Sequence, residues 1–183
     1  MTTWLRAEGG RARGPRAIWN AWIAILIKPS EFFERGITPG DQAPGLIFAM
    51  VTSAVAALFH LLTFPAYALV FGDRPALSML LVFAFIVLFI TPISLHVVAA
   101  VETLGLIGLV PNRNGISETV QVIGYSTAPC ALAGLPSPTL RVVVTAWGVA
   151  LLMYGTMVVH DADPLRSSVA SLLPSMLVFG FGF

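Results

Sequence analysis

Long apolar runs dominate the chain, and short polar turns separate them. The first run, 44–71, carries no charged residue and follows the turn Pro39-Gly40-Asp41. Because about 20 helical residues cover a hydrocarbon layer of about 30 Å, runs of this length predict membrane-crossing helices. The pattern predicts five crossings, over about 44–66, 76–104, 116–135, 140–159 and 165–183.

The second apolar run, 75–110, admits two interpretations. As one helix it would be roughly 54 Å long at about 1.5 Å per residue, too long for an upright crossing. Divided at Thr91-Pro92, each half would have only about 16 residues, fewer than a crossing needs. We favour one tilted crossing that is kinked near Pro92 and leaves the membrane beyond Glu102.

Residues 1–43 form a basic segment ahead of the first crossing. Its apolar stretch 17–27 ends at Lys28-Pro29 without a small-residue cleavage site, so we expect it to be retained rather than removed as a signal peptide. Helical spacing predicts an amphipathic helix in the membrane interface. The expected interfacial residues are Arg16, Trp19, Trp22, Lys28, Phe32 and Phe33. The alternative is a helix that docks on the bundle.

Composition places this pattern in a membrane. Hydrophobic residues make up 57% of the chain, charged residues 10%, and the mean hydropathy is +0.87, values incompatible with a water-facing surface. The single cysteine, Cys130, excludes an internal disulfide. The predicted fold class is therefore all-α: a polytopic transmembrane helical bundle with five spans over residues 44–183 plus an N-terminal interfacial amphipathic helix. Expected partners are the lipid bilayer, anionic lipid headgroups, and other membrane proteins or a second copy of the chain, with no nucleic acid.

The loop charges predict an orientation. With five crossings, one side holds eight Lys and Arg residues, six of them before the first crossing, and the other side holds two. The positive-inside rule then places the N-terminus in the cytoplasm and the C-terminus outside the cell membrane. Dividing 75–110 into two crossings would give seven against three, a weaker asymmetry.

The third predicted crossing contains many polar side chains for a membrane helix. A carboxylate in its first turn suits the helix dipole, and Ser117 is the expected N-cap. Polar groups facing lipid would be costly, so the deeper ones should face other helices or a wet cavity. The candidate residues are Glu118, Gln121, Tyr125, Ser126 and Pro129, the last of which bends the helix. Two interpretations stay open: a packed central helix, or a ligand or ion site at the bend.

Catalytic and cofactor motifs are absent from the sequence. It has no Gly-x-Ser-x-Gly elbow, no His-Glu-x-x-His, no Walker loop and no dinucleotide fingerprint, so we expect neither an enzyme nor a cofactor. No metal site is predicted either, because no two candidate ligands share one helical face at ligand spacing. Those candidates are His60, His96, Glu102, Cys130 and His160.

Two further patterns bear on the last part of the chain. His160-Asp161-Ala162-Asp163 predicts a solvated loop that ends in a helix cap. Ser167, Ser171 and Ser175 recur at four-residue steps, which predicts a face of small residues packed closely against other helices.

Two stretches resemble the Yip1 family, especially its prokaryotic, archaeal branch. They are KPSEFF at 28–33 and GISETVQVIGYSTAP at 115–129, and the similarity extends from about Trp19 to the C-terminus. The resemblance implies a five-span bundle with a cytoplasmic N-terminus. Eukaryotic relatives act in vesicle trafficking and bind small GTPases of the Rab type through long N-terminal regions. Small-GTPase binding is not carried over here, because only residues 1–43 precede the first crossing.

These observations predict a non-enzymatic integral membrane protein that organises membrane or scaffolds other membrane proteins. The alternative is a small transporter or channel with a polar path along the third crossing. A scaffold should lose partner association when Gly124 or Ser126 becomes bulky, whereas a transporter should lose flux on Glu118→Gln or Tyr125→Phe.

Overall fold

The protein is all-α in a computed structural model that describes residues 14–65, 71 and 74–181, and these residues contain no strand. The elements are α1 (Pro15–Ile27), α2 (Pro29–Gly36), α3 (Ala43–Thr63), α4 (Pro75–Phe85), the π-helical η3 (Ile86–Ile90), α5 (Thr91–Leu109), α6 (Ile116–Ser126), the 3₁₀-helical η4 (Ala128–Leu132), α7 (Pro138–Val159), α8 (Pro164–Ser175) and the π-helical η5 (Met176–Phe181). Arg6, Arg11 and Arg13 of the basic segment, and the expected ends of the first and fifth crossings, lie outside the described residues.

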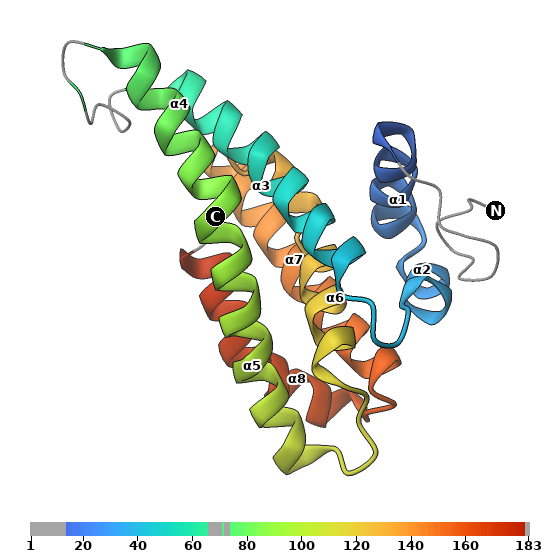
Figure 1. The fold of residues 1–183 in the computed structure, drawn as a ribbon. Coiled ribbons are helices and arrows are strands. Elements are labelled where there is room, and N and C mark those ends of the chain that lie inside the picture. Colours follow the sequence, from blue (N-terminus) through green and yellow to red (C-terminus); the bar gives the residue numbers. More distant parts are fainter. Residues whose placement is uncertain (1–13, 66–70, 72–73, 182–183) are drawn as a thin grey trace.

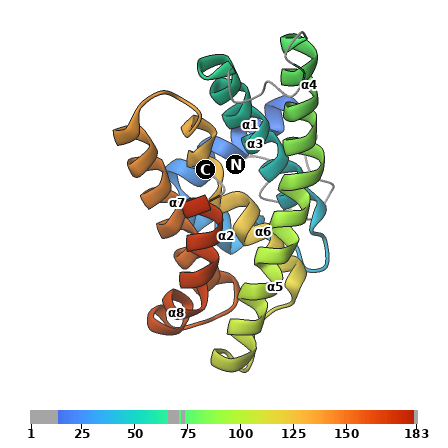
Figure 2. The ribbon, with the colours of Figure 1, turned by 90° about the vertical axis from the view of Figure 1, so that its left-hand side faces the viewer.

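The chain runs along the bundle in successive passes of alternating direction (Figures 1 and 2). These passes are α3, then α4 to α5, α6 with η4, α7, and α8 with η5. Helix α6 lies at the centre and packs against α3, α5 and α7, and every residue from Glu118 to Ser126 is buried. The expectation that this polar segment is enclosed by other helices therefore agrees with the fold.

The second apolar run forms one continuous helix, from Pro75 to Leu109. Pro92 cannot donate a backbone hydrogen bond, and the π-helical turn η3 lies directly before it. The Thr91 hydroxyl donates to the carbonyl of Ile86 at 3.0 Å, and the Thr91 N–H bonds the same oxygen. The widened turn thus absorbs the proline without breaking the helix.

The third apolar run, expected to be one crossing over about 116–135 with a bend at Pro129, is interrupted rather than merely bent. Its α-helix ends at Ser126 and a 3₁₀ turn follows, because a proline at 129 disfavours α-helical backbone in the residue before it. The Thr127 hydroxyl donates to the carbonyl of Gly124 at 2.7 Å and satisfies part of the exposed helix end. Among the described residues, three helices have the length and hydropathy to cross a membrane: Ala43–Thr63, Pro75–Leu109 and Pro138–Val159.

Glycines let α3 and α6 approach until their backbones touch. A Cβ on Gly45 would lie 2.6 Å from the Cα of Gln121, and a Cβ on Gly124 would collide with the carbonyl oxygen of Gly45. Gly134 likewise faces the backbone of Ala56, so η4 and its following turn lie directly on α3. Small residues at these points permit the close contact that packs helices tightly in a membrane.

Gly124→Ala should destabilise the bundle. The new methyl group would push α6 away from α3, and overpacking of this kind costs about 1–3 kcal/mol. Gly108→Ala is the matched control, because a Cβ at this α5 position meets nothing within 4 Å and alanine favours a helix. Thermal unfolding in detergent gives the melting temperature of each variant. Equal melting temperatures for the two variants would contradict the close α3–α6 contact.

Candidate functional site

Two polar side chains of α6 hold the loop between α2 and α3. The Gln121 side-chain amide donates to the carbonyl of Thr38 at 2.7 Å, and its Oε1 accepts from the Thr38 N–H at 3.1 Å. One turn earlier, Glu118 Oε1 accepts from the N–H of Gly40 at 3.1 Å. Residues three apart share one face of a helix, so both side chains reach the same loop. Their hydrogen-bonding capacity is used for packing rather than left facing a cavity.

The N-terminus of α6 is built differently from the expectation. Gly115, not Ser117, is the N-cap residue, and it makes no side-chain cap bond. The Ser117 hydroxyl is buried and makes no hydrogen bond to any other described residue. Glu118 does lie in the first turn, where the helix dipole favours its charge. The prediction of Ser117 as the N-cap was wrong because the helix begins one residue before it, at Ile116.

The other α6 candidates are buried among apolar side chains. The Tyr125 ring makes edge contacts with Phe32 and Phe48, at centroid distances of 4.9 and 5.3 Å. The Ser126 hydroxyl donates to the carbonyl of Val122 at 2.7 Å, a bond within its own helix. Pro129 is buried in η4. The structure therefore brings together Glu118 and Gln121 at one loop, and it places Tyr125, Ser126 and Pro129 in the packed core.

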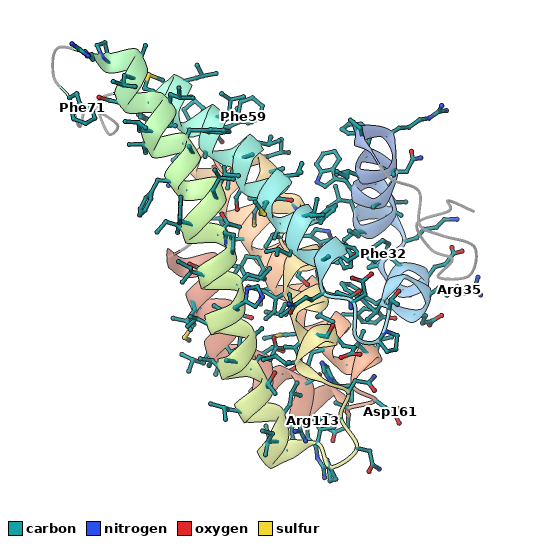
Figure 3. The ribbon with its side chains drawn as sticks, in the orientation of Figure 1. Phe32, Arg35, Phe59, Phe71, Arg113 and Asp161 are labelled. Carbon is teal, nitrogen blue, oxygen red and sulfur yellow. The ribbon has the colours of Figure 1, made fainter. Side chains whose placement is uncertain are left out.

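The expected interfacial residues divide into two groups. Arg16, Trp19 and Lys28 are exposed, and the Trp19 ring lies 5.0 Å from that of Trp22. Phe32 and Phe33 instead lie in the core, on the bundle side of α2, with Arg35 on the opposite side (Figure 3). Their position corrects the expectation of interfacial anchors: α2 packs against α7, so its aromatic face turns inward.

Helix α1 docks on the bundle through a face that the amphipathic pattern did not identify. Ala17, Ala21 and Ile25 are buried there, at four-residue steps. The indole N–H of Trp22 donates to the carbonyl of Ala128 at 2.6 Å, which ties α1 to η4. The helix therefore docks on the bundle, as in the alternative interpretation, through one face. Trp19 remains exposed on another face.

A buried carboxylate at the junction of α5, α7 and α8 was missed as a site. Glu102 Oε1 accepts from the Thr156 hydroxyl at 2.6 Å and from the Ser171 hydroxyl at 2.8 Å. The two hydroxyl oxygens lie 3.1 Å apart. The four-residue serine pattern does face inward as predicted, because Ser167, Ser171 and Ser175 are all buried. Two features of the sequence could have indicated this site: an acidic residue, Glu102, within a long apolar run, and a face of small hydroxyl residues on the last helix.

A second polar cluster lies where the α5–α6 and α7–α8 loops meet, at the end of the bundle marked by Arg113 and Asp161 (Figure 3). His160 Nε2 lies 3.3 Å from the hydroxyl of Thr119, and the Asn114 amide donates to the carbonyl of Val159. Burial lowers the pKa of His160 to about 4; the negative charge of Glu118 opposes this shift and the positive charge of Arg113 adds to it. His160 is therefore neutral at pH 7.

The α7–α8 loop ends in the predicted helix cap. Asp163 is the N-cap of α8, and its Oδ1 accepts from the N–H groups of Leu165 and Arg166 at 3.1 and 3.0 Å. Its Oδ2 also lies 2.9 Å from the Arg166 guanidinium. These bonds fix the first turn of α8.

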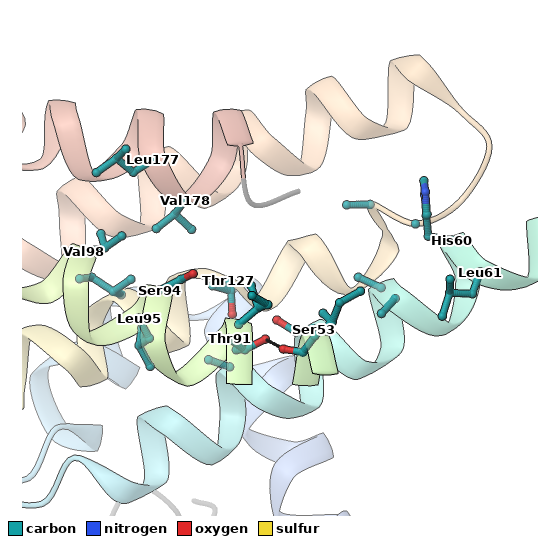
Figure 4. A pocket seen from close by; sticks show the side chains of 18 residues that line it. Ser53, His60, Leu61, Thr91, Ser94, Leu95, Val98, Thr127, Leu177 and Val178 are labelled. Atoms are coloured by element: carbon teal, nitrogen blue, oxygen red, sulfur yellow. Dashed lines mark hydrogen bonds between the residues drawn. The ribbon is translucent and has the colours of Figure 1, made fainter. Parts of the chain in front are cut away.

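A cavity of about 490 Å³ lies between α3, η3, α5 and the turn after α6. Most of its lining is apolar, and its polar lining residues are Ser53, His60, Thr91, Ser94 and Thr127 (Figure 4). The π-helical turn contributes Ile86 and Ile90 to the wall. Such a lining suits an alkyl chain better than a hydrated ion.

A Yip1 domain model matches residues 23–183. The chain belongs to the Yip1 family. The match includes both stretches that carried the resemblance, at 28–33 and 115–129, so that resemblance is confirmed; the archaeal branch stays a prediction. No curated protein sequence and no solved structure matches the chain. Family membership and the long apolar helices identify a membrane protein.

The described part of this Yip1-family protein contains no group of three or more His, Cys, Asp or Glu side chains arranged to hold a metal ion. Its one cysteine, Cys130, is buried in η4. The polar features of the bundle are therefore the α6–loop contacts, the Glu102 junction and the His160 cluster.

Single cysteines on α6 should be protected from aqueous reagents. In a Cys130→Ser background, cysteines replacing Gln121, Tyr125 or Ser126 should not react with a membrane-impermeant thiol reagent, because these positions are fully buried. Asn112→Cys, in the exposed α5–α6 turn, is the positive control. Labelling that continues inward along one face of α6 would mean that water reaches the helix and would contradict the dry packing.

The stability of the Yip1-family protein should fall as the pH drops below 6.5. In the unfolded chain His160 has an ordinary pKa of about 6.5, so that state binds more protons than the folded one between pH 6.5 and pH 4. The contribution of neutral His160 is complete above pH 6.5 and is lost as the pH approaches 4, on the order of 3 kcal/mol in total. His160→Gln should flatten this decline in thermal melts from pH 8 to pH 4.5. A decline of equal size in the variant would exclude His160 as its cause.

Proposed function

We propose that this Yip1-family protein is a non-enzymatic, multi-pass protein of the cell membrane that organises the bilayer and holds other membrane proteins together. In this proposal its passes are five membrane crossings, with the N-terminus in the cytoplasm and the C-terminus outside. The excess of Lys and Arg on the side of the N-terminus supports this orientation. The combined lengths of α6 with η4 and of α8 with η5, each about 27 Å, are compatible with crossings of a thin bilayer.

The observation that carries the proposal is the exposure of the long helix Pro75–Leu109. Its most apolar stretch has a mean hydropathy of 2.7, yet only 6% of that stretch is buried in the bundle, against 39% for each of the other two candidate spans. Within α4, Ser78 is the one buried residue. A helix so apolar and so little engaged by its own chain offers a surface to lipid and to other membrane helices.

The N-terminal helices support contact with the membrane surface. Arg16 on α1, Lys28 between the two helices and Arg35 on α2 are exposed, together with the large ring of Trp19. Basic side chains beside an exposed tryptophan are suited to anionic headgroups at the membrane interface. The docking of α1 on η4 through Trp22 would then fix the bundle relative to that surface.

The transport alternative has less support. A polar path along α6 would require Glu118, Gln121 and Ser126 to face water, but their side chains are buried and hydrogen-bonded to backbone groups. Opening the path would break these bonds.

Site-specific photocrosslinking in native membranes tests the scaffolding function. A photoreactive side chain at Leu81 or Leu88, both exposed on the long helix, should give discrete protein adducts in addition to lipid adducts. The matched control is Val142, which is equally apolar and exposed but lies on α7. Lipid adducts alone at all three positions would contradict scaffolding through this helix. Protein adducts of the same pattern from α7 would assign the contact to a different surface.

A further inference from the structure

The Glu102 junction, made by Glu102, Thr156 and Ser171, has an uneven hydrogen-bond pattern. Both hydroxyls donate toward the same carboxylate oxygen, Oε1. The other oxygen, Oε2, is fully buried and has no hydrogen-bond partner among the described residues. Ser175, one turn beyond Ser171 on α8, also has a buried hydroxyl without a hydrogen bond to any described residue. One side of the carboxylate is therefore satisfied and the other is open.

The charge of this junction is not balanced by a neighbouring side chain. In the described part of the chain, no Lys, Arg or His forms an ion pair with Glu102. A buried, unpaired carboxylate is expensive, and more so in a helix suited to cross a membrane. A positive charge bound at Oε2 would remove this cost.

The ligand chemistry of the junction suits a small monovalent cation. Two carboxylate oxygens and two hydroxyl oxygens are hard ligands, of the kind that alkali and alkaline-earth ions prefer over transition metals. A single carboxylate supplies one negative charge, which neutralises a monovalent ion and would leave a divalent ion with an uncompensated charge. Thr156 and Ser171 come from different helices, so an ion held here would join α5, α7 and α8.

We propose that Glu102, Thr156 and Ser171 form a sodium-binding site within the bundle. The ion lies on the Oε2 side of the carboxylate, and the hydroxyl oxygens keep lone pairs for it while their protons remain directed at Oε1. The buried Ser175 hydroxyl lies one turn beyond Ser171 on the same face of α8 and makes no hydrogen bond to any described residue. The binding strengthens the three-helix junction and requires no transport across the membrane.

A cavity of about 430 Å³ lies between the α5–α6 and α7–α8 loops, and its lining includes Val110, Asp161 and Asp163. Val110 directly follows the end of α5, and buried Leu106 lies between it and Glu102, about one helical turn from the carboxylate residue. Arg166 also lines this cavity and pairs with Asp163 at 2.9 Å, and buried Leu106 separates the cavity from the carboxylate of Glu102.

Thermal unfolding of the full-length protein in detergent, followed by tryptophan fluorescence, tests the proposal. Sodium chloride is titrated against choline chloride at constant ionic strength, with potassium chloride as a second series. At a sodium concentration roughly one hundred times Kd, linkage predicts a rise in Tm of about 7 °C. Glu102→Gln should abolish the rise, and Thr156→Val and Ser171→Ala should reduce it. Glu118→Gln is the matched control and should keep it, because Glu118 bonds to the α2–α3 loop instead.

Several outcomes would overturn the proposal. A Tm that is the same in sodium and choline for the wild-type protein shows that no sodium is bound. A sodium-dependent rise that persists in Glu102→Gln shows that sodium acts at a site other than Glu102. A Tm that changes with pH through Glu102 but never with sodium means that the site holds a proton only. If Glu102→Gln does not fold, binding of radioactive sodium to the wild-type protein and to Ser171→Ala gives the answer independently, and equal binding by both would reject the site.

Discussion

The bundle depends on the backbone contact between α3 and α6 at Gly45 and Gly124. Neither residue has a side chain to hold the helices apart, so the two backbones touch. This distance brings the Gln121 amide within hydrogen-bonding reach of Thr38. It also places Tyr125, one turn further along α6, against Phe48 of α3. A larger side chain at either glycine would therefore disturb the loop contacts and the aromatic core together.

The distribution of polar groups is that of a protein dissolved in lipid. The hydrocarbon core of a bilayer cannot form hydrogen bonds, so each polar side chain inside the bundle needs a partner from the protein. Glu118 and Gln121 obtain theirs from the α2–α3 loop, and Ser126 and Thr127 obtain theirs from carbonyls of α6. The long helix Pro75–Leu109, in contrast, exposes an almost uniformly apolar surface. A helix rich in polar side chains lies at the centre, and the most apolar of the three candidate spans lies at the periphery.

Features set by neighbouring residues were predictable before the structure. The apolar runs and polar turns located the helices, and proline chemistry at Pro92 and Pro129 indicated where two of them would deviate. Asp163 was identified as a helix cap because capping requires only residues two and three positions away. The N-cap of α6 was placed two residues late, at Ser117 instead of Gly115, since a cap depends on the exact first residue of the helix.

The long apolar runs in the sequence determined by themselves that this is a helical membrane protein, because an apolar run of about 20 residues is stable in few environments other than a bilayer. Only the tertiary structure decided which way each helix faces. Phe32 turned inward rather than toward the interface, and Glu102 met partners that are 54 and 69 positions away in the chain. The physical reason is that a helix apolar on every side can rotate about its axis at little cost in lipid. The rotation of the helix is set by close packing and by hydrogen bonds with neighbouring helices. These contacts join residues far apart in the chain, so the order of residues along one helix does not reveal them.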